Sequence, residues 1–152
     1  MTDVHAVAIR KKNMSAIKCR NTKPEVLLGK LLHKLGFRYR RNGKGLPGKP
    51  DLVFPKYKAV IFVNGCFWHM HSCKYFVWPK TRAGWWRDKI TTNHQRDLIV
   101  QDKLREMGWR VLVVWECAIK AKVGRELLIA SIAKWLEGEI PYTEFPAPEL
   151  NV

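Results

Sequence analysis

The stretch DLVFPKYKAVIFVN, residues 51–64, contains two short apolar runs joined by a tight polar connection. Short runs rich in β-branched and aromatic residues, bounded by turn residues, are typical of strands. The short connection predicts that DLVF (51–54) and AVIFV (59–63) pair as antiparallel strands. The second run has no polar residue, which indicates a central strand covered on both faces.

The chain before these strands predicts a helix and a further strand. Residues 21–36, NTKPEVLLGKLLHKLG, have apolar residues at helical spacing, and Thr22 and Gly36 are suited to cap and to end a helix. Residues 37–42, FRYRRN, alternate aromatic and basic side chains as a half-exposed strand does. The side chains of the helix expected to face the core are Val26, Leu27, Leu31 and Leu35.

The chain after these strands predicts a helix over residues 84–107, a buried strand at WRVLVVWE (109–116) and a helix at RELLIASIAKWLEG (125–138). The predicted order is therefore helix, strand, strand, strand, helix, strand, helix. This order predicts an α/β fold with a mixed central β-sheet flanked by helices on both faces.

Positive charge is concentrated near the N-terminus. The 152-residue chain has a formal net charge of +15. Residues 1–58 contain 15 basic and 3 acidic side chains, whereas residues 59–152 contain 13 and 10. A surplus gathered in one part favours a polyanion partner over a merely solvated basic surface.

We divide the chain into a basic N-terminal arm (1–23), one α/β domain (24–138) and a C-terminal tail (139–152). No apolar run approaches the roughly 20 residues of a membrane helix, and the first residues have no secretory core. We therefore expect a cytoplasmic protein with no membrane partner. Because thiols stay reduced there, its four cysteines are better candidates for metal ligands than for disulfides.

The stretch NGCFWHMHSC, residues 64–73, concentrates thiols, imidazoles and aromatic rings. Two cysteines and a histidine have the spacing C-x4-H-x-C. A further cysteine follows the buried strand at 109–116, and the end of this strand can lie beside the end of the strand at 59–63. Three thiolates and one imidazole close a tetrahedral zinc site with no open position. The predicted ligands are Cys66, His71, Cys73 and Cys117. Spacing alone also allows His69 in place of His71, and scattered buried cysteines are the alternative.

Asp51 directly follows Pro50 at the start of the first strand. Many metal-dependent nucleases hold magnesium with such a carboxylate, beside a strand of opposite direction that ordinarily supplies an acid, one further residue and a lysine. Here Phe62, Val63 and Asn64 occupy that region, and none is charged. A magnesium ion would therefore depend on Asp51, main-chain oxygens, water and substrate phosphates. The alternative is that Asp51 is a turn residue.

A histidine that zinc does not use is a candidate general base, because imidazole titrates near neutral pH. His69 has this position in the sequence, and Asp97 in the long helix is a candidate to orient it.

Several motifs resemble the very short patch repair (Vsr-type) mismatch endonucleases, in the same order from residue 3 to about residue 137. The motifs are DVH (3–5), KNMSAI (12–17), LPGKPD (46–51), GCFWH (65–69), WRVLVVWEC (109–117) and the pattern Lys89, Ile90, Asn93, Arg96, Asp97. The resemblance implies a restriction-endonuclease-like fold with a structural zinc. It also implies a Mg²⁺-dependent, strand-specific nick in double-stranded DNA. The cut lies 5′ of the thymine in a T:G mismatch that arises when 5-methylcytosine is deaminated.

The resemblance also implies roles for individual residues. The zinc ligands fall on Cys66, His71, Cys73 and Cys117. Asp51 and the main-chain carbonyl of Val63 are implied to bind magnesium, His69 to activate water, and Glu25 to lie near the water that the metal holds. The implied DNA contacts are Phe67, Trp68 and Trp86 as an aromatic wedge, Lys89 and Asn93 at the mismatched pair, and the basic arm around Met14 and Arg20. A mismatch-repair scaffold protein is an implied partner, and one nick on one strand needs only a monomer.

Two functional alternatives stay open at this level. One is a zinc-stapled DNA-binding module with weak or no catalysis, and the other is a nuclease of the same fold with another DNA substrate. Flanking sequence preference depends on a few contacts to base edges, so the sequence does not predict it.

Two residues depart from the family pattern: Val63 replaces a threonine, and Asn64 replaces a second catalytic histidine. Asparagine donates a hydrogen bond but carries neither a transferable proton nor a positive charge. We expect Asn64→His to raise the single-turnover nicking rate or to shift its pH profile, because an imidazole changes its charge near neutral pH. An identical rate across the pH range would contradict this expectation.

Overall fold

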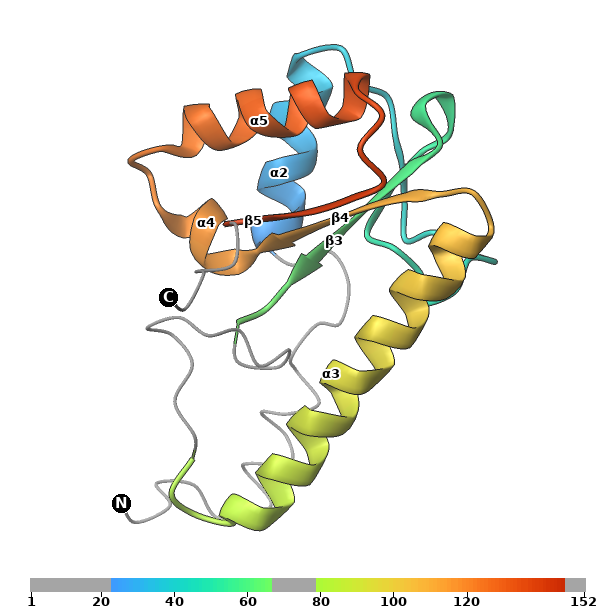
Figure 1. Cartoon of the computed structure of the whole chain (residues 1–152). Helices are drawn as coiled ribbons and strands as arrows, with labels where there is room; N and C mark the ends of the chain where they lie inside the picture. The colour runs from blue at the N-terminus through green and yellow to red at the C-terminus, as the bar shows by residue number, and fades with distance from the viewer. Residues whose placement is uncertain (1–22, 67–78, 147–152) are drawn as a thin grey trace, which may run out of the picture.

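The computed structural model describes residues 23–66 and 79–146. Figure 1 shows the helices and strands that these residues form. In chain order the elements are α2 (Lys23–Lys34), β1 (Arg40–Arg41), β2 (Leu52–Phe54), a 3₁₀ turn (Pro55–Tyr57), β3 (Ala59–Asn64), α3 (Ala83–Glu106), β4 (Arg110–Trp115), α4 (Glu116–Lys120), α5 (Arg125–Glu137) and β5 (Tyr142–Phe145).

The strands form one mixed five-stranded sheet in the order β1-β2-β3-β4-β5. The pairs β1–β2 and β2–β3 are antiparallel, whereas β3–β4 and β4–β5 are parallel. The predicted antiparallel pairing of 51–54 with 59–63 is confirmed, with Leu52 opposite Ile61. The predicted central position of the second run is also confirmed, because β3 is the middle strand.

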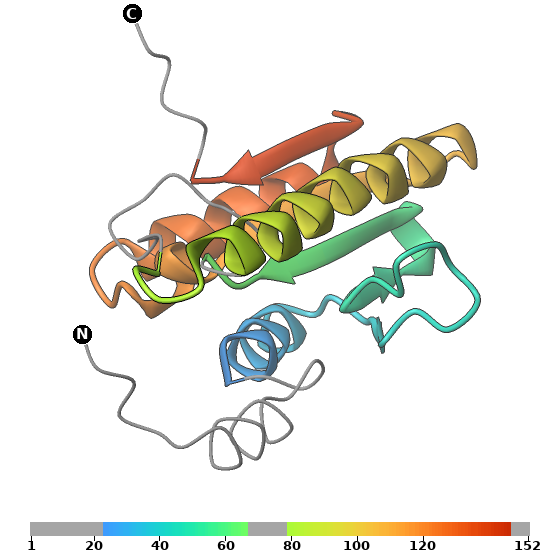
Figure 2. The same ribbon diagram turned by 90° about the horizontal axis from the view of Figure 1, so that it is seen from below.

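Helices cover both faces of the sheet, as the element order predicts. Alternate residues of β3 and β4, such as Ile61 and Leu112, pack in one core cluster with side chains of α2, α4 and α5. The residues between them, such as Val60 and Val113, pack in a second cluster with Leu104 of α3. Figures 1 and 2 show α3 lying along one face of the sheet, with its N-terminal half running past the end of β3.

Three details of the sequence prediction are wrong. The alternating segment 37–42 forms only a two-residue strand, β1. The segment expected to be a tail contains β5, which pairs with β4. Local pattern misses such an edge strand because a neighbour far away in the sequence stabilises it.

The third detail, the core-facing stripe of α2, is wrong in part, because the stripe is turned by about one residue. Leu28 and Leu32 are fully buried, whereas the predicted Leu27 and Leu31 are partly buried and pack against the same core cluster. Leu35 is 55% exposed because α2 ends at Lys34, before this residue can face the core. Within the part of the chain that the structure describes, no helix has the length and apolar character to cross a membrane.

Candidate active site

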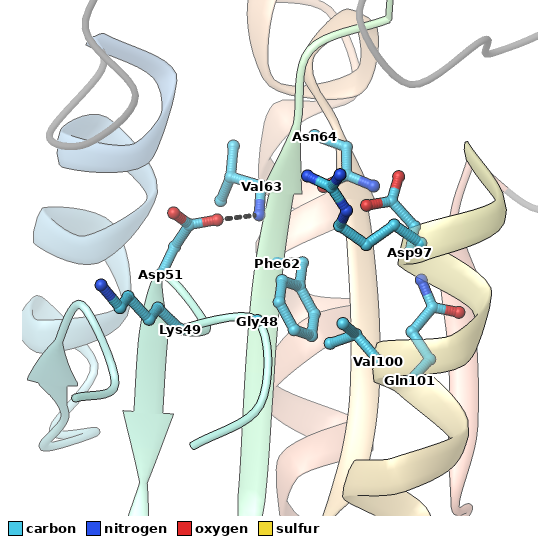
Figure 3. A pocket seen from close by; sticks show the side chains of 10 residues that line it. Gly48, Lys49, Asp51, Phe62, Val63, Asn64, Asp97, Val100 and Gln101 are labelled. Carbon is cyan, nitrogen blue, oxygen red and sulfur yellow. Dashed lines mark hydrogen bonds between the residues drawn. The ribbon is translucent and has the colours of Figure 1, made fainter. Parts of the chain in front are cut away.

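The Asp51 carboxylate is held against the end of β3. The Val63 backbone N–H donates a hydrogen bond of 2.7 Å to Asp51 Oδ2, as Figure 3 shows. The main chain of Asp51 is held from the other side, where the Asn42 N–H donates to the Asp51 carbonyl at 3.0 Å. The carboxylate therefore has a defined position between two strands, as the sequence predicts for an acid at the start of a strand beside an antiparallel neighbour.

The register of β2 and β3 explains why Val63 is available to Asp51. Leu52 lies opposite Ile61, and the same register continued by two residues brings Val63 opposite Pro50. The N–H and C=O of one strand residue point toward the same neighbouring strand, and an opposite residue ordinarily bonds to both. Proline has no N–H, so Pro50 offers no donor to the Val63 carbonyl. That carbonyl and the Asp51 carboxylate therefore face the same strand boundary.

A cavity of about 290 Å³ lies at this boundary. Its walls come from the loop before β2, the end of β3 and one side of α3. The lining residues are Gly48, Lys49, Asp51, Phe62, Val63, Asn64, Arg96, Asp97, Val100 and Gln101. Three predicted catalytic residues, Asp51, Asn64 and Asp97, are thus brought together from three separate segments (Figure 3).

The helical wall of the cavity is anchored in the core. Asp97, Gln101 and Leu104 follow at helical spacing on one side of α3, and both Gln101 and Leu104 are buried. Leu104 packs with Val60 of β3 in the second core cluster. Because α3 packs on the sheet in this way, Asp97 faces the end of β3 from a helix and not from a loop.

The opposite wall approaches the helix through a glycine. Gly48 has a φ of +70°, and a Cβ at this position would lie 2.3 Å from Val100 Cγ1. A side chain here would meet both an unfavourable backbone conformation and a steric clash. Gly48 therefore permits the loop to close the cavity against α3.

The predicted DNA-contacting residues of α3 lie on the side that lines the cavity. Trp86, Lys89, Asn93 and Asp97 are three or four residues apart, so they share one face of the helix. Lys89 is exposed, whereas Trp86 and Asn93 are half-buried. The Trp86 ring also packs edge-on against Trp85, with 4.7 Å between centroids. The 24-residue helix, about 36 Å long at 1.5 Å per residue, therefore links the cavity to a long surface stripe.

Glu25 does not line this cavity. Its side chain is 1% exposed, near the start of α2, and Glu25 Oε1 lies 3.8 Å from the Arg41 guanidinium of β1. Its predicted place near a metal-held water therefore stays a prediction.

Two of the four predicted zinc ligands lie at one edge of the sheet. Asn64 pairs with Trp115 in the parallel register of β3 and β4, and Cys66 and Cys117 each follow their strand residue by two positions. Cys66 is 1% exposed in the second core cluster, and Cys117 packs against that cluster. Residues 23–66 and 79–146 contain no group of three or more His, Cys, Asp or Glu side chains arranged to hold a metal.

The remaining predicted site residues lie outside the described ranges. They are Met14, Arg20, Phe67, Trp68, His69, His71 and Cys73. The roles expected of these residues stay predictions.

Sequence patterns did not single out Lys49, Val100 or Gln101 as cavity residues. Lys49 lies within the LPGKPD motif, and membership of this motif is the sequence feature that could have indicated a role for Lys49. Val100 and Gln101 carry no such signal, because only the packing of α3 on the sheet brings them to the site.

Comparison with known proteins gives matches along most of the chain. A sequence profile of the family described as DNA mismatch endonuclease Vsr matches residues 2–75, which include Asp51 and all of β3. The DNA mismatch endonuclease Vsr of Escherichia coli (strain K12) is 45% identical over 141 residues, covering 91% of this chain and 90% of that protein. The type II nicking enzyme V.NmeAIP of Neisseria meningitidis serogroup A is 47% identical over 122 residues, covering 80% and 87%. The type II nicking enzyme V.XorIIP of Xanthomonas oryzae pv. oryzae is 44% identical over 119 residues, covering 78% and 88%.

The contact between Gly48 and α3 can be tested by comparing two glycines of one loop. Gly48 and Gly45 both have positive φ, but a Cβ at Gly45 would meet no atom within 4 Å. We expect Gly45→Ala to lower the free energy of unfolding by about 1 kcal/mol through backbone conformation alone. Gly48→Ala should cost about 1–3 kcal/mol more because of the clash with Val100. Urea denaturation measures both, and equal losses would contradict the contact.

Proposed function

Because the chain belongs to the family of DNA mismatch endonuclease Vsr, we propose that the cavity at the ends of β2 and β3 is the centre where it cuts DNA. The chain is a DNA-nicking endonuclease, a hydrolase of phosphodiester bonds, and DNA is its partner. The observation that supports this location is the Asp51 carboxylate, held by the Val63 N–H in a cavity that also contains Asn64 and Asp97.

We further propose the substrate that the family resemblance implies. The enzyme cuts one strand 5′ of the thymine in a T:G mismatch, within a sequence context, on a restriction-endonuclease-like fold. Opening a duplex beside an ill-fitting pair costs less unstacking energy than opening it beside a matched pair. Trp86, Lys89 and Asn93 support contact with the mismatch from α3, because they lie on one face of this helix with the cavity residue Asp97.

Magnesium is proposed as the catalytic ion because the donor chemistry fits it. Hard oxygen ligands are the ones that Mg²⁺ prefers, and it commonly keeps waters and takes phosphate ligands as well. The Asp51 carboxylate and the Val63 carbonyl would hold it at the strand boundary. When bound, it would supply Lewis-acid stabilisation of negative charge on the phosphate.

The side chains around this ion divide the remaining work. His69 takes a proton from the attacking water, and Asp97 orients that imidazole from α3. Asn64, which is 6% exposed and lines the cavity, donates a hydrogen bond to a phosphate oxygen. Glu25 is proposed to assist through water rather than by direct contact, because it does not line the cavity.

Zinc is proposed as a structural ion bound by Cys66, His71, Cys73 and Cys117. The placement of Cys66 and Cys117 at matching positions beyond β3 and β4 supports this proposal. Such a closed site would fix the segment that contains Phe67, Trp68 and His69 relative to the sheet. The remaining proposals are DNA contacts from Met14 and Arg20, action as a monomer and binding to a mismatch-repair scaffold protein.

The role of Asp51 is tested with a labelled duplex that contains one T:G pair, with and without Mg²⁺. Asp51→Asn should lower the single-turnover nicking rate by more than about 10²-fold, because it removes the proposed ion's only charged protein ligand. The Kd for the duplex should stay nearly unchanged. Asp102→Asn is the matched control, since Asp102 is an exposed residue of α3 that does not line the cavity.

Each contrary outcome of this assay points elsewhere. Binding without Mg²⁺-dependent cutting by the wild-type chain would favour a zinc-stapled DNA-binding module. Equal cutting of a matched duplex would favour a nuclease with another DNA substrate. Nicking by Asp51→Asn at the wild-type rate would place the catalytic centre outside this cavity.

Zinc content tests the structural site. We expect about one zinc per wild-type chain by elemental analysis, and Cys117→Ser should lose most of it and unfold at a lower temperature. Zinc release should also increase in acid, because each cysteine thiol must lose its proton to bind zinc and acid protonates the thiolate again. Cys19→Ser is the control, because Cys19 is not a predicted ligand. Full zinc retention by Cys117→Ser would exclude Cys117 as a ligand.

A further inference from the structure

The cavity contains balanced charge, but the end of its central strand has none. Lys49 and Arg96 supply its two basic side chains, and Asp51 and Asp97 its two acids. Neither Asn64 nor its neighbours Phe62 and Val63 on β3 can offer a positive charge to a phosphate. Cutting a phosphodiester places growing negative charge on the phosphate oxygens, which a fixed cation in the site stabilises. Besides the proposed magnesium ion, a cationic side chain for this role must therefore come from a segment other than the end of β3.

Lys49 is positioned to be that cation. It lies two residues before Asp51, and Figure 3 shows its side chain on the Asp51 side of the cavity, away from α3. Its side chain is exposed, so the ammonium group is accessible to an external anion. Within residues 23–66 and 79–146, no carboxylate forms an ion pair with Lys49.

The backbone at Lys49 is held in a conformation that glycine adopts more easily. Its φ is +46°, directly after Gly48 with a φ of +70°. The Lys49 N–H donates to the Leu46 carbonyl at 3.1 Å, and the Pro50 carbonyl accepts from the Gly43 N–H at 2.7 Å. A non-glycine residue kept in a sparsely populated conformation is a feature that clusters at functional sites. The fixed backbone holds the point from which the Lys49 side chain extends close to Asp51 in the chain.

We propose that Lys49 is a catalytic residue that contacts the phosphate being cut and stabilises its negative charge in the transition state. This role rests on the proposed function of the cavity and adds a residue to it. Arg96 is the other basic side chain of the cavity. It lies on α3 next to Asp97, on the wall opposite the loop that precedes β2. Arg96 therefore serves as the comparison in the test.

Single-turnover nicking of the T:G duplex at saturating enzyme and Mg²⁺ separates catalysis from DNA binding. Lys49→Gln should lower the rate by about 10²-fold, the typical effect of removing one group that stabilises transition-state charge. Lys49→Arg should keep most of the rate, because it keeps the charge. Lys49→Gly should lose as much as Lys49→Gln while suiting the positive φ, so the loss cannot come from a distorted loop.

Two further variants provide the controls. Lys44→Gln removes an exposed charge from the same loop but outside the cavity, so it should keep the wild-type rate at saturation. The Kd of Lys49→Gln should rise no more than that of Lys44→Gln. If Arg96→Gln lost the nicking rate expected of Lys49→Gln while Lys49→Gln kept the wild-type rate, Arg96 would be the residue that stabilises the phosphate charge. This result would overturn the proposal.

Nicking by the wild-type chain tests the proposed function separately. If the wild-type chain cuts the duplex and Lys49→Gln cuts it equally fast at saturation, only the role of Lys49 is refuted. If the wild-type chain cuts no DNA, the proposed function fails and the role of Lys49 fails with it. A loss confined to Kd would identify Lys49 as a general phosphate contact and would also refute the proposal.

Discussion

The parallel pairing of β3 with β4 is the constraint on which the rest of this structure depends. Its register places Asn64 beside Trp115, so both strands end at one edge of the sheet. Cys66 and Cys117 follow there, and the cavity that contains Asp51 opens at the same end of β3. A shift by one residue would turn the side chains of β3 to the opposite face. The core clusters and the candidate site would then be lost together.

Proline has a specific part in the site because it ends the ladder between β2 and β3. Pro50 has no N–H to give to the Val63 carbonyl, and its own carbonyl accepts from the Gly43 N–H instead of from the Val63 N–H. The Asp51 carboxylate accepts the Val63 N–H instead. A buried donor left without a partner would cost about 1–3 kcal/mol. The same bond that satisfies the backbone therefore also orients the acid toward the cavity.

Helix α3 connects the cavity to a surface stripe through side chains on one side of the helix. Its C-terminal half packs on the sheet through Leu104 and forms a wall of the cavity with Asp97 and Val100. Its N-terminal half continues the same side past the end of β3, with Asn93 and Trp86 along it. A rigid helix in this arrangement would couple the position of a duplex bound along this stripe to the position of the proposed catalytic groups. The Gly48 contact with Val100 sets the width of the cavity between this helix and the Asp51 loop.

The sequence by itself determined the antiparallel pair, the central strand, the long helix and the place of Asp51 between the two antiparallel strands. These follow from local periodicity and from a proline–aspartate step, both of which depend on near neighbours. It did not predict β5 or the full burial of Leu28 and Leu32, and it did not place Lys49 beside Asp51 in a cavity. Only the tertiary structure decided these features, because each depends on the surface of an element distant in the chain. The packing of α3 against β3 is the clearest example, since it alone brings Asp97 and Val100 to a site that begins at Gly48.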